Sequence, residues 1–470
     1  MNESVETSFA TSNITKLILK FGIPCATSMV VQALYNIVDQ IFIGQSVGYL
    51  GNAATNVSFG IVVLAMAFAI FIGDGSAAYF SLMLGRGNKE KAEKAIGNCV
   101  TLLCLCTAIF MLIGFPFMKP LLKMFGATDE VMPYASVYTK IILMGLPASI
   151  FGAGLNSIIR ADGSPNFAMV TMLSGAVANI ILDPIFIFKF NMGVAGAAIA
   201  TIIGQYISLV LGLYYITRCK NVKLKGSSFV PDKQASFRIC TLGVSSFITQ
   251  MSLVVVISVV NNCLVKYGAN SIYGSEIPLA ALGIVMKVNS ILISLLLGIS
   301  LGSQPIIGYN YGAQEYARVK EAFKVTATIA TACAAVAFVA FMFFPQYIIL
   351  IFGQESPLYM EFAVKCFRLH LPCCIFNGFY FTSTILFQAI GQPVKSTTLS
   401  LTRQIIFIVP LTLALAVIMG LDGVLLGGAV ADFLAFIVAF SLVLKEMKEL
   451  NRLNLETQNK KTGAEPVAEV

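Results

Sequence analysis

Long apolar runs separated by short polar loops dominate the chain from residue 15 to residue 446. A helix that crosses the hydrocarbon core of a membrane needs about 20 mostly apolar residues, and twelve runs meet this requirement. They predict spans at 15–44, 54–84, 95–117, 135–159, 167–189, 193–217, 237–265, 278–307, 322–344, 360–387, 395–419 and 423–446. Membrane barrel strands alternate apolar and polar residues, which these runs do not. We therefore expect an all-α integral membrane protein.

Composition and charge agree with this interpretation. Of the 470 residues, 57% are hydrophobic and 11% are charged, whereas soluble domains average about 25% charged residues. The net charge is +8, but the basic residues cluster in short loops, as the positive-inside rule requires. We therefore expect contact with membrane lipids and no nucleic-acid partner. Residues 1–13 lack the basic start of a cleavable signal peptide, so the first apolar run should remain a membrane helix.

Orientation and domain limits follow from the basic residues and the longest polar interruption. If both termini are cytoplasmic, 21 Lys and Arg residues lie in inside loops or at the inside ends of spans, and four lie in outside loops. The domains predicted on this basis are a cytoplasmic segment 1–14, an N-terminal lobe 15–217, a cytoplasmic loop 218–236, a C-terminal lobe 237–446 and a cytoplasmic tail 447–470. We expect the plasma membrane as the location and disorder in the tail, which is polar after Asn451.

The two lobes repeat each other at the level of single residues. A shift of 225 residues, which becomes 228 near the end of each lobe, superimposes identical residues. The pairs are Gly73 and Gly298, Gly87 and Gly312, Glu90 and Glu315, Ala92 and Ala317, Pro147 and Pro372, Gly163 and Gly391, and Pro165 and Pro393. An even number of spans per repeat gives both lobes the same orientation. Transporters built in this way place the binding site between the lobes and rock around it.

Five polar side chains of the first span share one helical face. They are Ser28, Gln32, Tyr35, Asn36 and Asp39. A polar stripe on a membrane helix faces protein or water rather than lipid. The alternative is a purely structural seam of hydrogen bonds between helices, but five polar groups that end in a carboxylate favour function. We therefore take Ser28, Gln32, Tyr35 and Asn36 as candidates to line a substrate cavity. Pro24 removes a backbone hydrogen bond near the cytoplasmic side and predicts a bend there.

Two later spans supply further oxygen atoms at membrane depth. Asn179 and Asp183 are neighbours on one face of the fifth span, and Thr201 follows in the sixth. Together with Asp39 they would form a pocket whose oxygen ligands suit a proton or Na⁺. Two carboxylates that share such a pocket repel each other, so we expect one of them to hold a proton near neutral pH.

Other charged and polar residues inside the spans permit more than one interpretation. Asp74 in the second span fits a functional role and a packed gate equally well. Lys287 and Arg403 are both candidates to pair with Asp432, for which a structural salt bridge is the simpler explanation. One face of the tenth span carries candidate substrate contacts. These are Asn377, Phe381, Thr384 and Gln388.

Enzyme and metal signatures give little support to a catalytic function. The sequence contains none of the Walker A, H-E-x-x-H and G-x-S-x-G motifs, so we expect no enzyme activity, no cofactor and transport driven by an ion gradient. The eleven cysteines form no C-x-x-C pair, and most lie in apolar runs as small hydrophobic residues. His370, close to Cys373 and Cys374, is a weak metal candidate.

Three motifs make the chain resemble a known family. They are PCATSMVVQALYNIVDQIFIG in the first span, RADGSP at 160–165 and NIILDPIFIF at 179–188, and a GQP after the tenth span fits as well. With these motifs, residues 14–446 resemble the multidrug and toxic compound extrusion (MATE) family, in its bacterial branch of multidrug export proteins. The resemblance implies two six-helix lobes in a V and efflux of drugs against H⁺ or Na⁺. It further implies a cation-responsive site at Asp39, Asn179, Asp183 and Thr201, and a bend at Pro24 linked to coupling.

Two other functions compete with export of cationic and amphipathic small molecules. A lipid-linked oligosaccharide flippase of the same broad superfamily handles pyrophosphate groups and should line its cavity with Arg and Lys. The charged residues at membrane depth in the first half are Asp39, Asp74 and Asp183, which favours cationic or neutral substrates. A membrane sensor or scaffold does not require the two-lobe repeat or the buried acids. No feature of the sequence indicates an oligomer, so we expect a monomer.

Overall fold

The computed structural model describes residues 9–47, 49–125, 127–269, 271–274, 276–352 and 357–462, which are helical with short connections. The first lobe contains α2 (Ile14–Val47), α3 (Tyr49–Gly85), α4 (Lys89–Gly114), α5 (Met118–Met124), α6 (Met132–Ala161), α7 (Pro165–Pro184), η1 (Ile185–Lys189) and α8 (Gly193–Ile216). After η2 (Gly226–Phe229), the second contains α9 (Lys233–Gly268), α10 (Glu276–Gly312), α11 (Tyr316–Phe343), α12 (Pro345–Phe352), α13 (Pro357–His370), η3 (Cys374–Phe376), α14 (Asn377–Ala389), α15 (Pro393–Leu401), η4 (Thr402–Ile408), α16 (Val409–Met419) and α17 (Leu421–Thr462).

The predicted membrane architecture is confirmed, with one difference in the tenth span. Among the described residues, 11 helices are long and apolar enough to cross a membrane, and a bent pair brings the number to as many as 12. The bent pair occupies the expected span 360–387, where α13 and α14 meet at an angle of 44°. Pro372 lies at this break. Proline interrupts a helix because it lacks the backbone N–H and its ring crowds the preceding turn. Its counterpart Pro147 lies inside the unbroken helix α6.

The internal repeat is visible in the order of the elements. Short helices α5 and α12 occupy equivalent places, and a π-helical segment follows α7 in one lobe and α15 in the other. The turn that begins each of these helices contains a glycine with positive φ, +84° at Gly163 and +79° at Gly391. Residues that carry a Cβ atom rarely adopt a positive φ. The matching glycines in RADGSP and in the second-lobe GQP therefore allow the same turn in each lobe.

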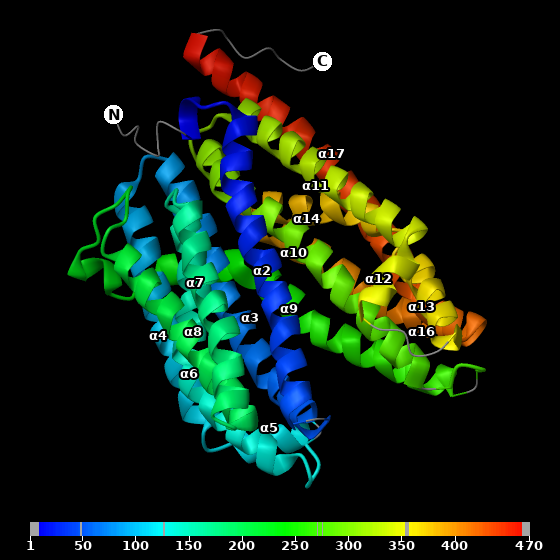
Figure 1. Cartoon of the computed structure of the whole chain (residues 1–470). Helices are drawn as coiled ribbons and strands as arrows, with labels where there is room; N and C mark the ends of the chain where they lie inside the picture. The colour runs from blue at the N-terminus through cyan, green and yellow to red at the C-terminus, as the bar shows by residue number, and fades with distance from the viewer. Residues whose placement is uncertain are drawn as a thin grey trace.

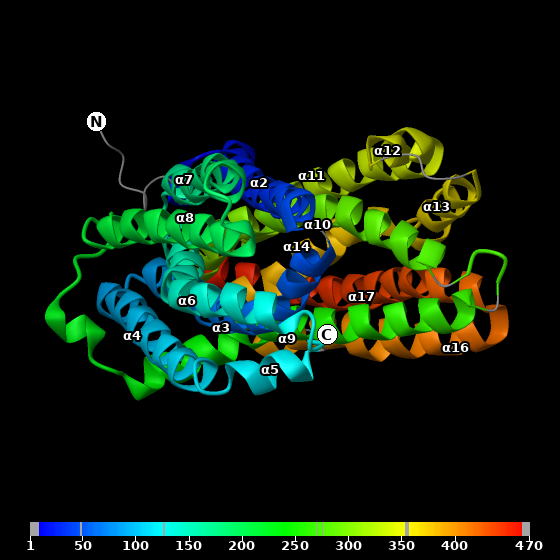
Figure 2. The ribbon, with the colours of Figure 1, turned by 60° about the horizontal axis from the view of Figure 1, so that its bottom comes forward.

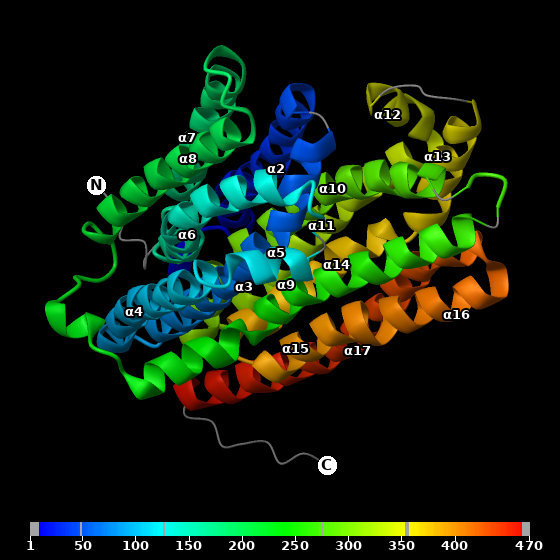
Figure 3. The same cartoon turned by 90° about the horizontal axis from the view of Figure 1, so that it is seen from below.

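The two lobes are in contact at one end and diverge at the other. Figure 1 shows α2 beginning and α17 ending at the end where the lobes meet, while α9 and α10 lead away from α2 and α3 towards the opposite end. Seen with that opposite end forward, α4, α6 and α8 lie on one side and α13, α16 and α17 on the other (Figure 2). The view from below shows α15, α16 and α17 along the outer edge of the second lobe (Figure 3).

Glycines bring the lobes together at the closed end. A Cβ atom on Gly298 would lie 2.4 Å from the Ala26 Cα, and one on Gly302 would lie 2.7 Å from the Gly22 Cα. On the other side of the interface, a Cβ on Gly243 would lie 1.9 Å from the Phe71 carbonyl oxygen. Because no other residue permits such close approach of two helices, the backbones of α2 with α10 and of α3 with α9 are in direct contact.

The segment before α2 crosses from one lobe to the other. Phe9 is buried and its ring lies 5.4 Å from those of Phe21 and Tyr309, measured between centroids. Arg318 of α11 donates to the carbonyl oxygens of Phe9 (2.9 Å) and Ser12 (2.8 Å). This segment therefore ties the start of the first lobe to the second at the closed end.

The C-terminal tail corrects the expectation of disorder after residue 446. Helix α17 continues to Thr462, and residues 463–470 lie outside the described part of the chain. Leu450 is fully buried, and Arg452 forms ion pairs with Glu449 and Glu456. Such pairs at helical spacing stabilise a helix modestly, and the packing of Leu450 stabilises it further. The polar composition of the tail did not indicate either contribution.

Candidate functional site

Three helices bring the predicted acidic residues together in the first lobe. Asp39 lies in the C-terminal half of α2, Asn179 and Asp183 lie in the last two turns of α7, and Thr201 lies in the third turn of α8. Asp183 and Asn179 are buried, and Asp39 is half-buried. The π-helical segment η1 starts directly after Pro184, which lacks the N–H needed for a regular helical hydrogen bond.

Hydrogen bonds connect the members of this cluster. The amide nitrogen of Asn179 donates to Asp183 Oδ1 (3.2 Å) and to Thr201 Oγ1 (3.3 Å). The carboxyl groups of Asp39 and Asp183 are close enough to interact electrostatically. The structure thus joins the four residues that the sequence analysis assigned to one pocket.

Three acceptor oxygens of the cluster lack a donor. They are Asp39 Oδ1, Asp183 Oδ2 and Asn179 Oδ1, each buried and without a hydrogen-bond partner among the described residues. A buried acceptor that is left unpaired is costly, and more so for a charged group. One proton held between the two carboxyl groups, or a bound Na⁺, would supply the missing interaction, because hard cations prefer oxygen ligands.

Apolar and aromatic side chains enclose the cluster, and the sequence analysis missed one of them. Tyr138 of α6 is buried, and it interacts electrostatically with Asp39, Asp183 and Tyr35. It belongs to a small apolar core with Ile43 and residues of η1 and α8. A tyrosine near the end of a span is equally typical of the membrane interface, so only the packing of α6 identifies the place of Tyr138 beside the acids.

Of the remaining residues of the polar stripe on α2, Tyr35 also interacts electrostatically with Asp39 and Asp183, whereas Ser28 and Asn36 form their hydrogen bonds within α2. The Ser28 hydroxyl donates to the Pro24 carbonyl oxygen (2.8 Å), and the Asn36 amide donates to the Gln32 carbonyl oxygen (2.9 Å). Tyr35 interacts with the Gln32 side chain. Helix α2 is continuous through Pro24. Asn36 is exposed and Ser28 is buried, so these residues lie at different depths in the protein.

The second-lobe candidates for substrate contact use their polar groups within the lobe. Asn377 donates to Asp432 Oδ2 (2.9 Å), and the Thr384 hydroxyl donates to the Tyr380 carbonyl oxygen (3.1 Å). Gln388 donates to the Leu242 carbonyl oxygen (3.0 Å). Asn377, Phe381 and Gln388 are buried, and Thr384 is half-buried.

Asp74 belongs to a polar network that crosses between the lobes. Its carboxylate accepts from Ser157 (2.8 Å) and from Ser246 of α9 (3.1 Å), and Arg160 lies 3.6 Å away. Ser246 also accepts a hydrogen bond from Gln388 (3.2 Å). Of the two roles considered for Asp74, this geometry supports packing at the closed end.

Asp432 pairs with one of its two candidate partners. Arg403 Nε lies 2.8 Å from Asp432 Oδ1, and the guanidinium group is 5.2 Å from the centroid of the Tyr380 ring. Lys287 is exposed on α10, and no ion pair or side-chain hydrogen bond joins it to another residue in the described ranges. The buried charges of the second lobe are therefore internally compensated, whereas those of the acidic cluster are not.

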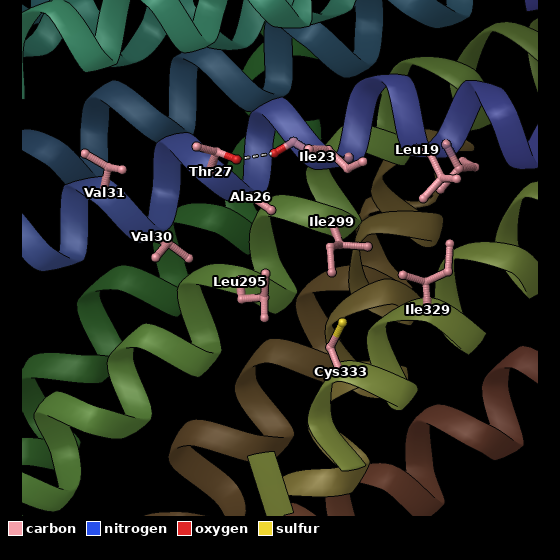
Figure 4. A pocket seen from close by; sticks show the side chains of 12 residues that line it. Leu19, Ile23, Ala26, Thr27, Val30, Val31, Leu295, Ile299, Ile329 and Cys333 are labelled. Carbon is pink, nitrogen blue, oxygen red and sulfur yellow. Dashed lines mark hydrogen bonds between the residues drawn. The ribbon is translucent and has the colours of Figure 1, made fainter. Parts of the chain in front are cut away.

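An apolar groove lies on a different face of the interface between the lobes. It encloses about 420 Å³ and is lined by α2, α10 and α11 through residues that include Ile23, Thr27, Leu295, Ile299 and Cys333 (Figure 4). The Thr27 hydroxyl donates to the Ile23 carbonyl oxygen (2.9 Å) rather than into the groove. Ile23 is 60% exposed, so the groove opens to the surface of the protein.

His370, Cys373 and Cys374 are the residues that the sequence offered as a weak metal candidate. His370 Nδ1 lies 3.1 Å from the Leu425 carbonyl oxygen in the second lobe. In the described ranges, no group of three or more His, Cys, Asp or Glu side chains is arranged to hold a metal ion.

Comparison with known proteins identifies relatives along most of the chain. The family model MatE matches residues 24–185 and 247–414. The multidrug export protein MepA of Staphylococcus haemolyticus is 28% identical over 447 residues, which cover 92% of this chain and 95% of that protein. MepA of Staphylococcus aureus is 24% identical over 436 residues, covering 93% and 94%.

Solved structures share the fold. An outward-facing multidrug resistance MATE transporter superimposes with a TM-score of 0.89 at 24% identity, covering 96% of this chain and 99% of that one. A MATE structure in a straight conformation gives 0.89 and one in a bent conformation gives 0.88, both at 23% identity. At this identity the likeness establishes the arrangement of helices.

Proposed function

The chain belongs to the MATE family of multi-pass membrane transporters, and from this premise we propose that it is a cation-coupled antiporter that exports cationic and amphipathic compounds. The observation that supports the proposal most strongly is the group of unpaired acceptor oxygens at Asp39, Asn179 and Asp183. Carboxylates at membrane depth cost at least about 3 kcal/mol each on insertion scales, and they usually belong to ion or proton pathways.

Coupling follows from competition for the same charge. When a proton or Na⁺ binds between Asp39 and Asp183, the acidic cluster loses negative charge. Its attraction for a cationic substrate falls, and the substrate is released. When the cation leaves on the other side of the membrane, the negative charge returns and a new substrate binds. Alternating access of this kind requires that the lobes open on one side at a time.

The direction of opening depends on the orientation in the membrane. We propose a plasma-membrane location with both termini cytoplasmic, which the distribution of Lys and Arg supports. The closed end, where α2 begins and α17 ends, is then cytoplasmic, and the structure is open to the outside (Figure 1). The outward-facing relative is consistent with this assignment.

Energetics restrict the stoichiometry. One elementary charge that crosses 100 mV yields about 2.3 kcal/mol, enough for a gradient of about 50-fold at 1.4 kcal/mol per decade. Exchange of one H⁺ for one monovalent cation moves no net charge, so only the pH gradient drives export. An exchange of two coupling ions for one substrate adds the contribution of the membrane potential.

A flippase for lipid-linked oligosaccharides remains the competing function, and the charges oppose it. A pyrophosphate group needs several free basic side chains in the cavity. The two buried arginines of the described spans, Arg160 and Arg403, are committed to Asp74 and Asp432.

Ethidium transport in proteoliposomes tests the proposed function. We expect an imposed pH or Na⁺ gradient to drive ethidium against its concentration gradient. An ionophore that dissipates the driving ion gradient should stop this transport. Liposomes without the protein serve as the control. Absence of uphill transport under both gradients would refute the proposal.

A further inference from the structure

The apolar groove of Figure 4 has one wall in each lobe. Helix α2 forms one wall between Leu19 and Val31, and α10 and α11 form the other. At about 1.5 Å per residue, the α2 wall is about 18 Å long. The Thr27 hydroxyl is bonded to the Ile23 carbonyl oxygen (2.9 Å), and the other lining side chains are apolar apart from the Cys333 thiol. Sites for polar ligands offer a few free polar groups, so this long apolar lining suits a hydrocarbon chain.

The order of contacts around α10 shows which way the groove opens. Gly298 packs on α2, and Gly308, about 80° to one side of it around the helix, packs on α3. The groove residues Leu295 and Ile299 lie about 60° and about 100° to the other side of Gly298. The groove is therefore on the side of the α2–α10 contact that faces away from α3. Ile23 at its rim is exposed within a membrane span, so the groove opens towards membrane lipid.

Two lysines continue the α2 wall of the groove towards the closed end. Lys16, Lys20, Ile23 and Thr27 follow one another at intervals of four, three and four residues, so they share one face of the helix within about 60°. The lysines precede Ile23 by about 10 Å and about 5 Å along the helix. Both are exposed, and within the described ranges neither ammonium group forms an ion pair or a hydrogen bond. The apolar groove therefore ends at two free positive charges.

We propose that the groove binds one acyl chain of an anionic phospholipid from the leaflet at the closed end, and that Lys16 and Lys20 bind the phosphate group of this lipid. Lysine donates charge-assisted hydrogen bonds to phosphate oxygens, and basic sites between membrane helices recognise anionic headgroups. Glu321, an exposed acid on α11 near this end, lies about 80° around that helix from the groove residue Ile329. Neither the acidic cluster nor a transported compound takes part, so the inference is independent of the proposed transport.

A lipid in this groove contacts both lobes at once. Gly22 lines the groove, and a Cβ atom on Gly302 of α10 would lie 2.7 Å from its Cα atom. The groove thus adjoins the closest contact between the lobes, and separation of α2 from α10 would separate its walls. A ligand that binds one of two conformations shifts the equilibrium towards that conformation. The bound lipid therefore stabilises the closed end.

Native mass spectrometry of the delipidated protein tests the headgroup site. The probes are phosphatidylglycerol, which is anionic, and phosphatidylcholine with the same acyl chains, which has no net charge. The dissociation constant of each lipid is measured for the unmodified protein and for the double variant Lys16→Gln/Lys20→Gln. Lys324→Gln is the matched control, because Lys324 is exposed near the same end but lies about 140° around α11 from Ile329.

We expect the unmodified protein to bind phosphatidylglycerol about tenfold more tightly than phosphatidylcholine. The double lysine variant should weaken binding of phosphatidylglycerol at least about fivefold, because each lysine contributes to attraction of the anionic headgroup, and it should leave phosphatidylcholine unchanged. Lys324→Gln should change neither lipid. An unchanged preference for phosphatidylglycerol in the double variant would overturn the inference.

A second pair of variants tests the chain site and the effect on the lobes. Cys333→Phe places a ring in the groove and should weaken binding of both lipids, whereas Cys104→Phe places the same ring on an exposed site of α4 and should not. Spin labels at the closed end, measured in nanodiscs, should show a larger closed population in phosphatidylglycerol than in phosphatidylcholine, and Cys333→Phe should remove this difference. Unchanged lipid binding in Cys333→Phe, or equal closed populations in the two lipids for the unmodified protein, would contradict the inference.

Discussion

At the residue scale, the two lobes treat their buried charges differently. The repeat offset of 228 places Arg403 at the counterpart of Gly175, and Asp432 at the counterpart of Gly204. In the first lobe these glycines bring α7 and α8 into backbone contact, since a Cβ on Gly175 would lie 2.7 Å from the Gly204 carbonyl oxygen. The second lobe has an ion pair there, which compensates its charges, so we assign the proposed ion coupling to the acids of the first lobe.

The Arg403–Asp432 pair should therefore behave as a structural element. Arg403→Met leaves a buried carboxylate without its cation, and loss of one member of such a pair costs about 3–5 kcal/mol. We expect a clear drop in the midpoint of thermal unfolding in detergent. Combination with Asp432→Asn should recover much of the loss, because the remaining amide needs no counter-charge. If the double variant is as unstable as Arg403→Met alone, loss of the ion pair does not explain the drop in the unfolding midpoint.

The sequence predicted those members of the acidic cluster that are polar residues at helical spacing or acids within spans. Asn179 and Asp183 at i and i+4 predicted a shared face, and the acids of separate spans suggested a common pocket. Tyr138 could not be found, because a tyrosine near the end of a span has several explanations. The choice of Arg403 over Lys287 as the partner of Asp432 depends on how α10 and α17 pack, which no local pattern specifies.

At the element scale, glycine contacts decide how tightly the closed end holds together. Gly298 lies on the α10 face that touches α2, whereas a Cβ on Gly283 of the same helix would meet no atom within 4 Å. The two positions differ in their surroundings and not in residue type or helix, so they form a matched pair.

We expect Gly298→Ala to destabilise the closed end by about 1–3 kcal/mol, the usual cost of overpacking, which shifts the conformational equilibrium by about 5- to 150-fold. Spin labels on the two lobes at that end should then show longer distances by pulsed electron paramagnetic resonance. Gly283→Ala should leave the distance distribution unchanged. Identical distributions in the two variants would contradict a role for the α2–α10 contact.

The sequence predicted the elements well and their interruptions poorly. Hydropathy predicted the spans because every backbone group in lipid must be paired within a helix. The break in the tenth span was missed, since Pro372 and Pro147 look alike in the sequence, yet only the former interrupts its helix. The helical tail was also missed, because its stability depends on burial of Leu450 and not on composition.

At the scale of the whole molecule, the fold separates the closed end, where the lobes are in contact, from the acidic cluster. The glycine contacts, the Asp74 network and the Phe9 segment hold the lobes together at one end. The acids Asp39 and Asp183 lie in the C-terminal halves of α2 and α7, away from the closed end at which α2 begins. The repeat in the sequence predicted two equivalent lobes, but their relative position depends on contacts between residues far apart in the chain.

The central claim is that the carboxyl pair carries the coupling cation, and uphill ethidium transport by variants in proteoliposomes tests it most directly. Asparagine has the shape of aspartate but neither carries charge nor exchanges a proton at neutral pH. We predict that Asp39→Asn and Asp183→Asn each fold, bind ethidium and lose uphill transport at least about tenfold, while the exposed control Asp129→Asn transports as the unmodified protein does. Unchanged uphill transport in either acid variant, at equal protein content, would contradict the account.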